Sequence, residues 1–386
     1  MMDQKKSTPV FERKLVDTAP VWIDSDEQLK ELCDRLHTQG AVALDTEFMR
    51  SRTFYPLPAL VQLGDGKRCY LIDNLAIDDL EPLRALLLDS RVVKIMHSCS
   101  EDLETLDRLL GVVPEPIFDT QIAAAISGMG AGLGYAATVS QLLQIDLPKS
   151  ETRSDWLQRP LSESQKNYAA LDVAWLPLVY AMLLKKLREQ DRLDWLWEDC
   201  NAIVQAAHTP ESPESYYRKV KGAWRLRPNQ LAVLQDLCAW REREARVRNM
   251  PRNHLLKENV CMSLAQAMPK YLATLSQPGL EGKTLRKYGD TLLEIINRAS
   301  ERDDLPPRLP QPLNREQGEV LKLLRNKVNA LAEAAGLPPE ILVRKKELEL
   351  LVQADKPELE GRLQGWRRAI VGEPLLEELQ SLRQSQ

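Results

Sequence analysis

The chain has 386 residues, of which 44% are hydrophobic and 28% charged, with a formal net charge of −4. This length exceeds one ordinary domain and predicts two or three, and the composition excludes collagen, a coiled-coil rod and wholesale disorder. No apolar run approaches the roughly 20 residues that a membrane helix needs. Residues 1–20 form a polar lead-in without the apolar stretch of a secretory signal, so we expect a cytoplasmic protein.

The spacing of the cysteines and histidines argues against a zinc site. Six cysteines are scattered without a CxxC pair, and four histidines lack a metal-binding spacing. The cysteines are expected to be reduced, buried thiols. Any metal site must therefore be built from carboxylates, which favours hard cations such as Mg²⁺ or Mn²⁺.

Charge is distributed unevenly along the chain. Residues 1–217 hold 22 basic and 34 acidic residues, whereas residues 218–290 hold 15 basic and 6 acidic ones. Residues 313–386 are balanced, with 12 of each. An acidic segment beside a basic one indicates carboxylate chemistry in the first and a surface for a polyanion in the second.

Residues 21–207 are predicted to form an α/β domain. Periodicity and turn signals place these elements in chain order: helix Ser25–Leu36, strand Ala41–Leu44, a hairpin of Ala59–Leu63 and Cys69–Ile72 around Gly64–Gly66, strand Arg91–Met96, helix Ser100–Leu110 and a long helix Ser162–Arg188. Because the strands come early and close together, we expect a mixed sheet flanked by helices rather than a doubly wound parallel sheet.

Two all-helical units are predicted to follow. The Pro- and Ser-rich residues 207–215 and the proline-dense residues 301–313 have the composition of linkers. The predicted units occupy 216–298 and 313–380. Helices are expected at Pro228–Val247, Cys261–Met268, Thr284–Arg298, Gln317–Ala335 and Pro338–Val352.

The first candidate site motif follows the strand at 41–44. Asp45 and Glu47 come directly after this apolar run, and alternate residues of a strand share one face. Two carboxylates at that spacing repel each other unless a cation lies between them. Taken alone, this motif is equally compatible with a solvated turn.

A second carboxylate motif follows the strand at 91–96. Asp102 ends the segment His97–Asp102 and lies in the first turn of the predicted helix. There it could serve the site, or it could simply interact favourably with the helix dipole.

The third motif is Tyr168 with Asp172, spaced so that both lie on one face of a helix. By itself this pair could also be a tyrosine at the edge of the core beside an exposed aspartate.

Together, in this order, the three motifs resemble the DEDD exonuclease superfamily, in its tyrosine-containing branch. Within that superfamily the chain is most similar to the ribonuclease D family, over essentially its whole length. Residues 216–298 and 313–380 resemble tandem HRDC domains. Further phrases that support the resemblance are Arg50–Pro56, Leu60–Leu63, Ser100–Glu104, Phe118–Gln121 and Lys149–Trp156.

This resemblance implies a ribonuclease H-like exonuclease domain at 21–207 and a 3′→5′ exoribonuclease activity. Asp45, Glu47, Asp102 and Asp172 are then expected to hold two divalent ions, Mg²⁺ or Mn²⁺. Tyr168 is expected to orient the attacking water. The implied products are 5′-monophosphates, and the implied substrates are tRNA precursors with 3′ extensions and other small structured RNAs. We expect a monomer.

Several residues are candidates for binding the substrate. Phe48 is expected either to contact the terminal base or to anchor the core, and Lys149, Arg153 and Trp156 fit a loop that faces the substrate. A cluster of arginines near the end of the helix at 228–247 is expected either to contact RNA phosphates or to be a solvated helix face. These arginines are Arg241, Arg243, Arg246 and Arg248.

Two other functions remain open at this stage. One is a DNA 3′→5′ exonuclease of the same superfamily, because the metal chemistry barely distinguishes the two sugars. The other is a non-catalytic adaptor that binds nucleic acid, against which the presence of all four carboxylates and Tyr168 argues.

Overall fold

The structure is a computed structural model that describes residues 16–148, 154–276 and 279–384. The chain folds into two compact units. Unit 1 comprises Met1–Met49, Pro56–His208 and Leu313–Gln386, and unit 2 comprises Arg50–Tyr55 and Thr209–Pro312. A short segment early in the sequence therefore packs in the helical unit that follows more than 150 residues later.

Within the described residues, unit 1 contains one mixed sheet of six strands in the order β1-β4-β3-β2-β5-β6. Strand β2 is central, antiparallel to β3 and parallel to β5. The strands are β1 (Pro20–Ile23), β2 (Ala41–Met49), β3 (Leu57–Gly64), β4 (Cys69–Ile72), β5 (Val93–Met96) and β6 (Ile117–Asp119). The mixed sheet and the β3–β4 hairpin expected from the sequence are confirmed.

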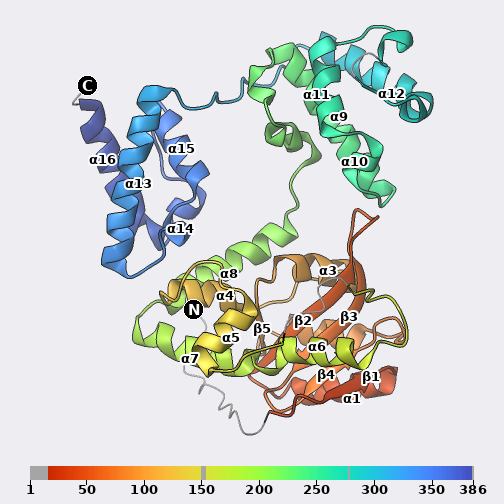
Figure 1. The fold of residues 1–386 in the computed structure, drawn as a ribbon, viewed down its shortest axis with the longest axis vertical. Coiled ribbons are helices and arrows are strands. Elements are labelled where there is room, and N and C mark those ends of the chain that lie inside the picture. The colour runs from red at the N-terminus through yellow and green to blue at the C-terminus, as the bar shows by residue number, and fades with distance from the viewer. Residues whose placement is uncertain (1–15, 149–153, 277–278, 385–386) are drawn as a thin grey trace. The chain divides into compact units, whose positions relative to one another are not determined.

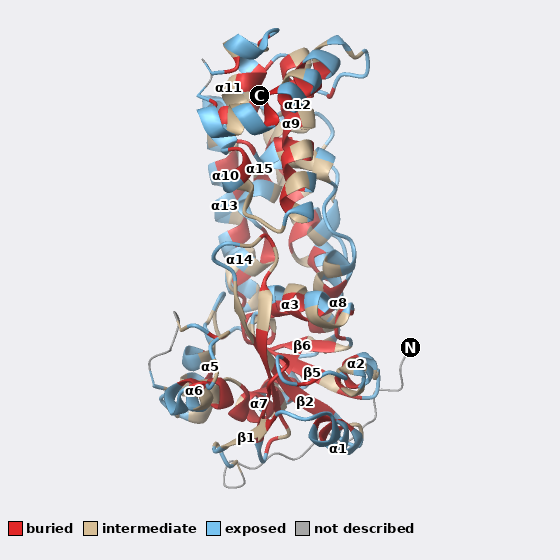
Figure 2. Ribbon diagram, turned by 90° about the vertical axis from the view of Figure 1, so that its right-hand side faces the viewer, coloured by how far each residue is buried: buried red, intermediate tan, exposed pale blue. Residues whose placement is uncertain are grey.

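Helices cover both faces of this sheet (Figure 1). Alternate residues of β2 point to opposite sides: Ala41 and Ala43 pack with α4 and α6–α8, whereas Val42 and Leu44 pack with α1–α3. Figure 2 shows the strands buried between these helices. The helices are α1 (Asp26–Leu36), α2 (Glu81–Leu88), α3 (Ser100–Leu110), α4 (Thr120–Ile126), α5 (Tyr135–Leu143), α6 (Glu163–Ala174), α7 (Leu176–Glu189) and α8 (Leu193–His208).

Strand β2 is longer than the pattern predicted. The expected end at residue 44 is wrong, because pairing with β3 continues to the pair of Met49 and Leu57. Backbone hydrogen bonding to a neighbouring strand does not depend on side-chain polarity, so the acidic residues do not end the strand. Asp45 and Glu47 therefore lie within β2, and a β-bulge follows between Glu47 and Phe48.

The single helix predicted at 162–188 is two helices separated at Trp175. Pro177 lies in the first turn of α7, where its missing N–H is tolerated but where it could not continue α6. Ser162 caps α6 through a capping box with Gln165. Glu163–Glu189 is long and apolar enough to cross a membrane, but 61% of its most apolar stretch is buried inside the protein, so core packing accounts for its apolar character.

Unit 2 is all-helical around the long helix α9 (Pro228–Val247), as predicted. Its other α-helices are α10 (Arg252–Leu255), α11 (Glu258–Ala267) and α12 (Gly282–Glu301), with short 3-10 helices at Pro213–Lys219, Ala223–Arg225 and Leu272–Thr274. Phe54 belongs to the core of this unit and is 8% exposed.

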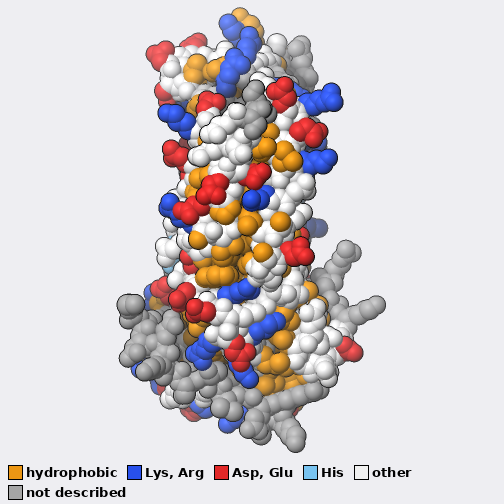
Figure 3. Space-filling view, turned by 90° about the vertical axis from the view of Figure 1, so that its left-hand side faces the viewer, with side chains coloured by type: hydrophobic (Ala, Val, Ile, Leu, Met, Phe, Trp, Pro, Cys, Tyr) orange, Lys and Arg blue, Asp and Glu red, His pale blue; other side chains and the backbone are white. Residues whose placement is uncertain are grey.

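The C-terminal part of unit 1 is also all-helical. It contains α13 (Arg315–Ala335), α14 (Pro339–Leu342), α15 (Lys345–Gln353) and α16 (Glu373–Gln384). The helix predicted at 338–352 is broken, because Val343 and Arg344 are extended. Acidic and basic side chains are interspersed on the face of the molecule shown in Figure 3.

Two contacts attach these C-terminal helices to α8. The guanidinium of Arg367, with a side chain that is 1% exposed, donates to both carboxylate oxygens of Asp199 at 2.7 and 2.6 Å. Next to it, the rings of Trp195 and Trp366 stack with centroids 4.6 Å apart. A bidentate, buried pair has a fixed geometry, so it orients the helices that it joins.

Candidate active site

Strand β2 directs Asp45 and Glu47 to one side of the sheet. Both continue the alternation of Ala41 and Ala43, whose face packs against α6 and α7. Each carboxyl group is partly buried. The alternation inferred from the sequence therefore places both acids on one face of the strand, on the side of the sheet that α6 covers.

Asp102 reaches the same region from the first turn of α3 and is 8% exposed. The hydroxyl of Thr46, which lies between the two acids of β2, donates to its Oδ1 at 2.6 Å. The start of α3 is itself fixed, because the carboxylate of Asp119 accepts hydrogen bonds from the backbone N–H groups of Ser98 and Cys99. Sequence analysis missed Thr46, which orients Asp102.

Helix α6 supplies Tyr168 and, one turn later, Asp172. The tyrosine hydroxyl is hydrogen-bonded to this carboxyl group. The helix approaches the sheet closely at Gly64, where a Cβ atom would lie 2.8 Å from the carbonyl oxygen of Val173. Only glycine permits that approach, so Gly64 helps to set the position of Asp172.

Tyr135 fixes the end of α6 beside the site. Its hydroxyl donates to the carbonyl oxygen of Leu171 at 3.0 Å and accepts from the N–H of Trp175 at 3.3 Å. These bonds hold the break between α6 and α7, directly after Asp172. Nothing in the sequence distinguished this tyrosine from a core aromatic residue.

Burial, together with the charges of neighbouring acids, raises the pKa of all four carboxyl groups. Burial, and then the charges of Asp172 and Asp102, raises the pKa of Glu47 to about 9. Burial raises the pKa of Asp102 and of Asp172 to about 7, although hydrogen bonds from Thr46 and Tyr168 oppose the rise. The pKa of Asp45 is raised by burial and by the other three acids. Among the described residues, none of the four forms an ion pair with a lysine or arginine.

Such a set of oxygen donors fits a hard divalent cation. Carboxylates that repel one another in a partly buried space are stabilised by Mg²⁺ or Mn²⁺, which prefer oxygen ligands. Within the described part of the chain, however, no three acidic, histidine or cysteine side chains are already arranged as a ligand set. The chemistry of the donors therefore fits, and the carboxylates need to move together to bind a cation.

The residues predicted to bind substrate in this unit have different positions. Trp156 is 4% exposed and packs in the core, with its ring centroid 6.1 Å from that of Tyr168. The prediction that it faces the substrate is therefore wrong, because it supports Tyr168 instead. Phe48 is partly buried beside the bulge in β2, and its role stays a prediction. Lys149 and Arg153 lie outside the described residues.

A cavity of about 420 Å³ adjoins Tyr168 and Asp172. Tyr135, Leu147 and Leu171 contribute to its walls, which are mostly apolar. An apolar cavity that opens beside a few polar groups is typical of a site for a small ligand or the end of a chain.

The four arginines predicted to contact RNA do not form one exposed patch. Arg241 is 5% exposed, and its guanidinium contacts the carbonyl oxygen of Leu256 within unit 2. Arg243, Arg246 and Arg248 are each in an ion pair with a glutamate. These ion pairs, with Glu214, Glu242 and Glu244, favour the alternative of a solvated helix face, and RNA contact by the four arginines stays a prediction.

Comparisons with known proteins bear on this geometry. A family model described as 3′-5′ exonuclease matches residues 20–188, and the HRDC domain model matches residues 230–296. Ribonuclease D of Pseudomonas paraeruginosa is 48% identical over 373 residues, which cover 94% of this chain and 99% of that protein. The chain belongs to the ribonuclease D family. Ribonuclease D of Escherichia coli is 36% identical over 376 residues, which cover 94% of this chain and 99% of that protein.

A crystal structure supports the same family. Escherichia coli RNase D, described as an exoribonuclease involved in structured RNA processing, matches with a TM-score of 0.86 and 35% identity, over 94% of this chain and 98% of that one. Membership in the ribonuclease D family makes the chain a 3′→5′ exoribonuclease, a hydrolase of phosphodiesters that binds RNA. The resemblance drawn from the motifs is confirmed, and the exonuclease superfamily is metal-dependent.

The raised pKa values predict that metal-free protein loses stability as pH rises. The folded-state pKa values, about 7 for Asp102 and Asp172 and about 9 for Glu47, exceed the ordinary values of 3.8 and 4.5. At pH values between each group's ordinary pKa and its raised folded-state pKa, the folded state binds more protons than the unfolded state. The free energy of unfolding therefore falls as pH rises through this range. Thermal unfolding in chelator should give a lower Tm at pH 9 than at pH 6. The expected decrease is roughly 2–4 °C for each kcal/mol lost from the free energy of unfolding.

Divalent cations should reverse this loss, with a larger rise in Tm at pH 9 than at pH 6. The control is the double variant Asp45→Asn/Glu47→Gln, which removes two of the interacting charges. Its Tm should depend less on pH and respond less to Mg²⁺ or Mn²⁺. An equal cation effect in both proteins would show that the ions bind elsewhere.

Proposed function

We propose that this chain removes nucleotides one at a time from RNA 3′ ends as 5′-monophosphates, by hydrolysis that depends on two divalent ions. The observation that carries the proposal is that Asp45, Glu47, Asp102 and Asp172, from β2, α3 and α6, are buried close enough for their charges to affect the pKa of neighbouring acids. Their mutual repulsion has no basic counterpart among the described residues. These four carboxylates would hold the ions.

Divalent ions at this place would promote the attack of water and stabilise the charge of the departing 3′ oxygen. The protein's own residues prepare the site for that chemistry. Thr46 fixes one oxygen of Asp102 by its hydrogen bond. Ala43 and Gly64 let α6 approach the sheet, which brings Asp172 toward β2.

Tyr168 would orient the attacking water rather than take its proton. Burial, followed by the charges of Asp172, Glu47 and Asp45, holds the pKa of Tyr168 well above its usual range. The phenol is therefore protonated at neutral pH and cannot act as a base. Because its O–H donates to Asp172, its oxygen can orient the water by accepting a hydrogen bond from it. Trp156 packs near its ring and limits its movement.

The proposed substrates are tRNA precursors with 3′ extensions and other small structured RNAs. The Escherichia coli relative, described as acting in structured RNA processing, supports this choice. The HRDC domain lies in the basic segment, where 15 basic residues face 6 acidic ones over residues 218–290. Such a segment favours a polyanionic partner. We further propose that the protein acts in the cytoplasm as a monomer.

Digestion of a 3′-extended tRNA tests the catalytic proposal. Wild-type protein with Mg²⁺ or Mn²⁺ should shorten the RNA from its 3′ end and release 5′-monophosphates, and chelator should stop the reaction. Asp45→Asn keeps the size of the side chain but removes a ligand charge. It should lower kcat/KM by more than the roughly 10–100-fold that changes around a metal's ligands cost.

A matched DNA oligonucleotide and Asp73→Asn serve as controls. Asp73 is a buried aspartate of unit 1 that pairs with Arg159, so its replacement tests for nonspecific damage. DNA digested as fast as RNA would indicate a general exonuclease. Salt-sensitive RNA binding without any digestion would contradict the catalytic proposal.

Tyr168→Phe tests the positioning role. The variant keeps the ring that packs near Trp156 but lacks the hydroxyl, so kcat should fall about 100-fold through loss of positioning. KM and the Mg²⁺ concentration for half-maximal rate should change little. An unchanged kcat, or a large loss of metal affinity, would contradict this role.

A further inference from the structure

Unit 2 buries an arginine that has no acidic partner in the part of the chain that the structure describes. Arg241 on α9 is 5% exposed, and its Nη1 donates to the carbonyl oxygen of Leu256 at 3.3 Å. Its Nε is buried without any hydrogen-bond partner, and no ion pair of Arg241 occurs among the described residues. A buried guanidinium is costly unless an anion pairs with it, so this arrangement points to a missing anion.

A cavity beside Arg241 could hold such an anion. Arg241 lines a cavity of about 570 Å³, which we call the arginine cavity, together with Arg50, Arg252 and Asn253. One acid, Glu258, also lies on its wall and accepts a hydrogen bond from a backbone N–H at 3.4 Å. Arg252 is paired with Glu242, so Arg241 and Arg50 against Glu258 leave this cavity with a net positive charge.

The wall of the arginine cavity is well ordered by contacts within unit 2. The side-chain oxygen of Asn249 accepts from the N–H groups of Phe54 and Tyr55 at 3.1 and 3.0 Å. Arg252 lies over the ring of Phe54, 4.6 Å from its centroid. The segment that leaves β2 is thus held in a fixed conformation, and a ligand would meet a preformed site.

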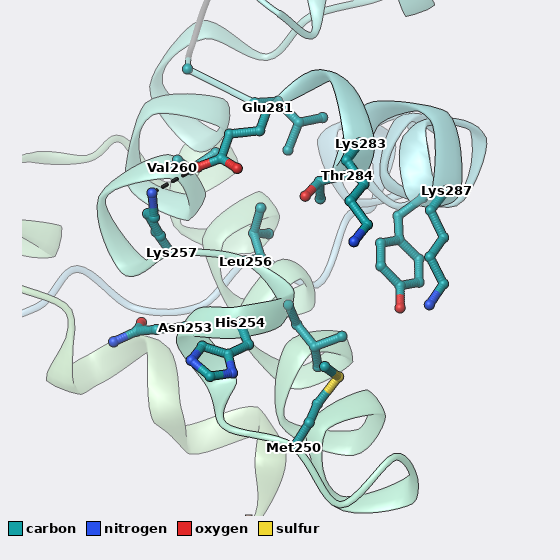
Figure 4. A pocket seen from close by; sticks show the side chains of 14 residues that line it. Met250, Asn253, His254, Leu256, Lys257, Val260, Glu281, Lys283, Thr284 and Lys287 are labelled. Atoms are coloured by element: carbon teal, nitrogen blue, oxygen red, sulfur yellow. Dashed lines mark hydrogen bonds and ion pairs between the residues drawn. The ribbon is translucent and has the colours of Figure 1, made fainter. Parts of the chain in front are cut away.

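A second cationic cavity adjoins the first. Its volume is about 460 Å³, and Asn253 lines both cavities. Figure 4 shows Lys283 and Lys287 extending from α12 toward the side where His254 lies. Lys257, in contrast, forms an ion pair with Glu281. Neither Lys283 nor Lys287 forms an ion pair among the described residues. We call this the lysine cavity.

Two further features of the lysine cavity favour an anion. The first turn of α12, with its free backbone N–H groups, contributes Lys283 and Thr284 to the wall. Tyr288, which is 9% exposed, lines the same cavity, and its hydroxyl is buried without a hydrogen-bond partner. An unpartnered hydroxyl can donate to a bound oxygen.

We infer that the arginine and lysine cavities together bind successive phosphates of a single RNA strand. This inference rests on the proposed function, which supplies RNA as the ligand. A guanidinium fits two phosphate oxygens, and lysine adds a point charge. Such contacts hold the backbone without reading sequence, as trimming of varied RNAs requires. Of the four arginines singled out in the sequence, Arg241 lines the arginine cavity, and the other three are each paired with a glutamate.

RNA binding by a catalytically inactive protein tests this inference. In an Asp45→Asn background with Mg²⁺, fluorescence anisotropy would measure the Kd of a labelled single-stranded 20-nucleotide RNA over a range of salt concentrations. Arg241→Met and Lys283→Ala/Lys287→Ala should each weaken binding about 10-fold. Each lost phosphate contact should also reduce the slope of log K against log salt by about 0.7.

The matched control is Lys219→Ala/Arg243→Ala, which removes two charges from the same unit. Both residues are engaged by glutamates, so this variant should change Kd less than about twofold. A loss equal to that of Lys283→Ala/Lys287→Ala would mean that overall charge alone attracts RNA, and would overturn the inference.

Three other outcomes are decisive. Arg241→Met should leave Tm in the absence of RNA unchanged or higher, because it removes an uncompensated buried charge. A lower Tm with unchanged Kd would make Arg241 structural and overturn its assignment.

Matched single-stranded DNA should show the same losses of affinity, since DNA and RNA have the same phosphate groups. Losses confined to RNA would contradict phosphate binding. If the Asp45→Asn protein with intact cavities bound no RNA, the proposed function itself would fail.

Discussion

Mutual repulsion of four carboxyl groups is the constraint around which unit 1 is arranged. Burial raises the pKa of Asp45, Glu47, Asp102 and Asp172, and the charges of neighbouring acids add to this rise. A fold gains nothing in stability from such a cluster, so it persists only where neighbouring contacts determine it. Those contacts include the Thr46 hydroxyl, the close approach at Gly64 and the hydrogen bonds of Tyr135 and Asp119. A divalent cation would turn this repulsion into attraction and make metal binding part of the folded state's stability.

Much of this site could be predicted because its signals are local. The two-residue period of a strand fixed the shared face of Asp45 and Glu47, and the four-residue spacing on a helix paired Tyr168 with Asp172. Helix α3 begins at Ser100 as predicted, since the change from strand to helical periodicity is sharp there. The mixed sheet followed from early, closely spaced strands. The order of the three motifs then identified the family, which neither composition nor any single motif could do.

Contacts between distant residues could not be predicted. Trp156 looked like a loop residue, but packing near Tyr168 buried it. The arginines of α9 formed one cluster in sequence, yet burial separated Arg241 from three neighbours that glutamates neutralise. The insertion of Arg50–Tyr55 into unit 2 and the pair of Arg367 with Asp199 join residues more than 150 positions apart. No local pattern encodes them. The acidic residues inside β2 misled the prediction of its end, because strand pairing with β3 continues through them to Met49.

Crystals grown with Mn²⁺ offer the most direct test of the metal site, because anomalous scattering locates the ions without relying on activity. The account predicts two Mn²⁺ ions, each bound by carboxylate oxygens from among Asp45, Glu47, Asp102 and Asp172, with both lost in Asp45→Asn/Asp172→Asn crystals. Ions bound only at other acidic side chains, or four carboxylates that bind no ion at saturating Mn²⁺, would contradict it.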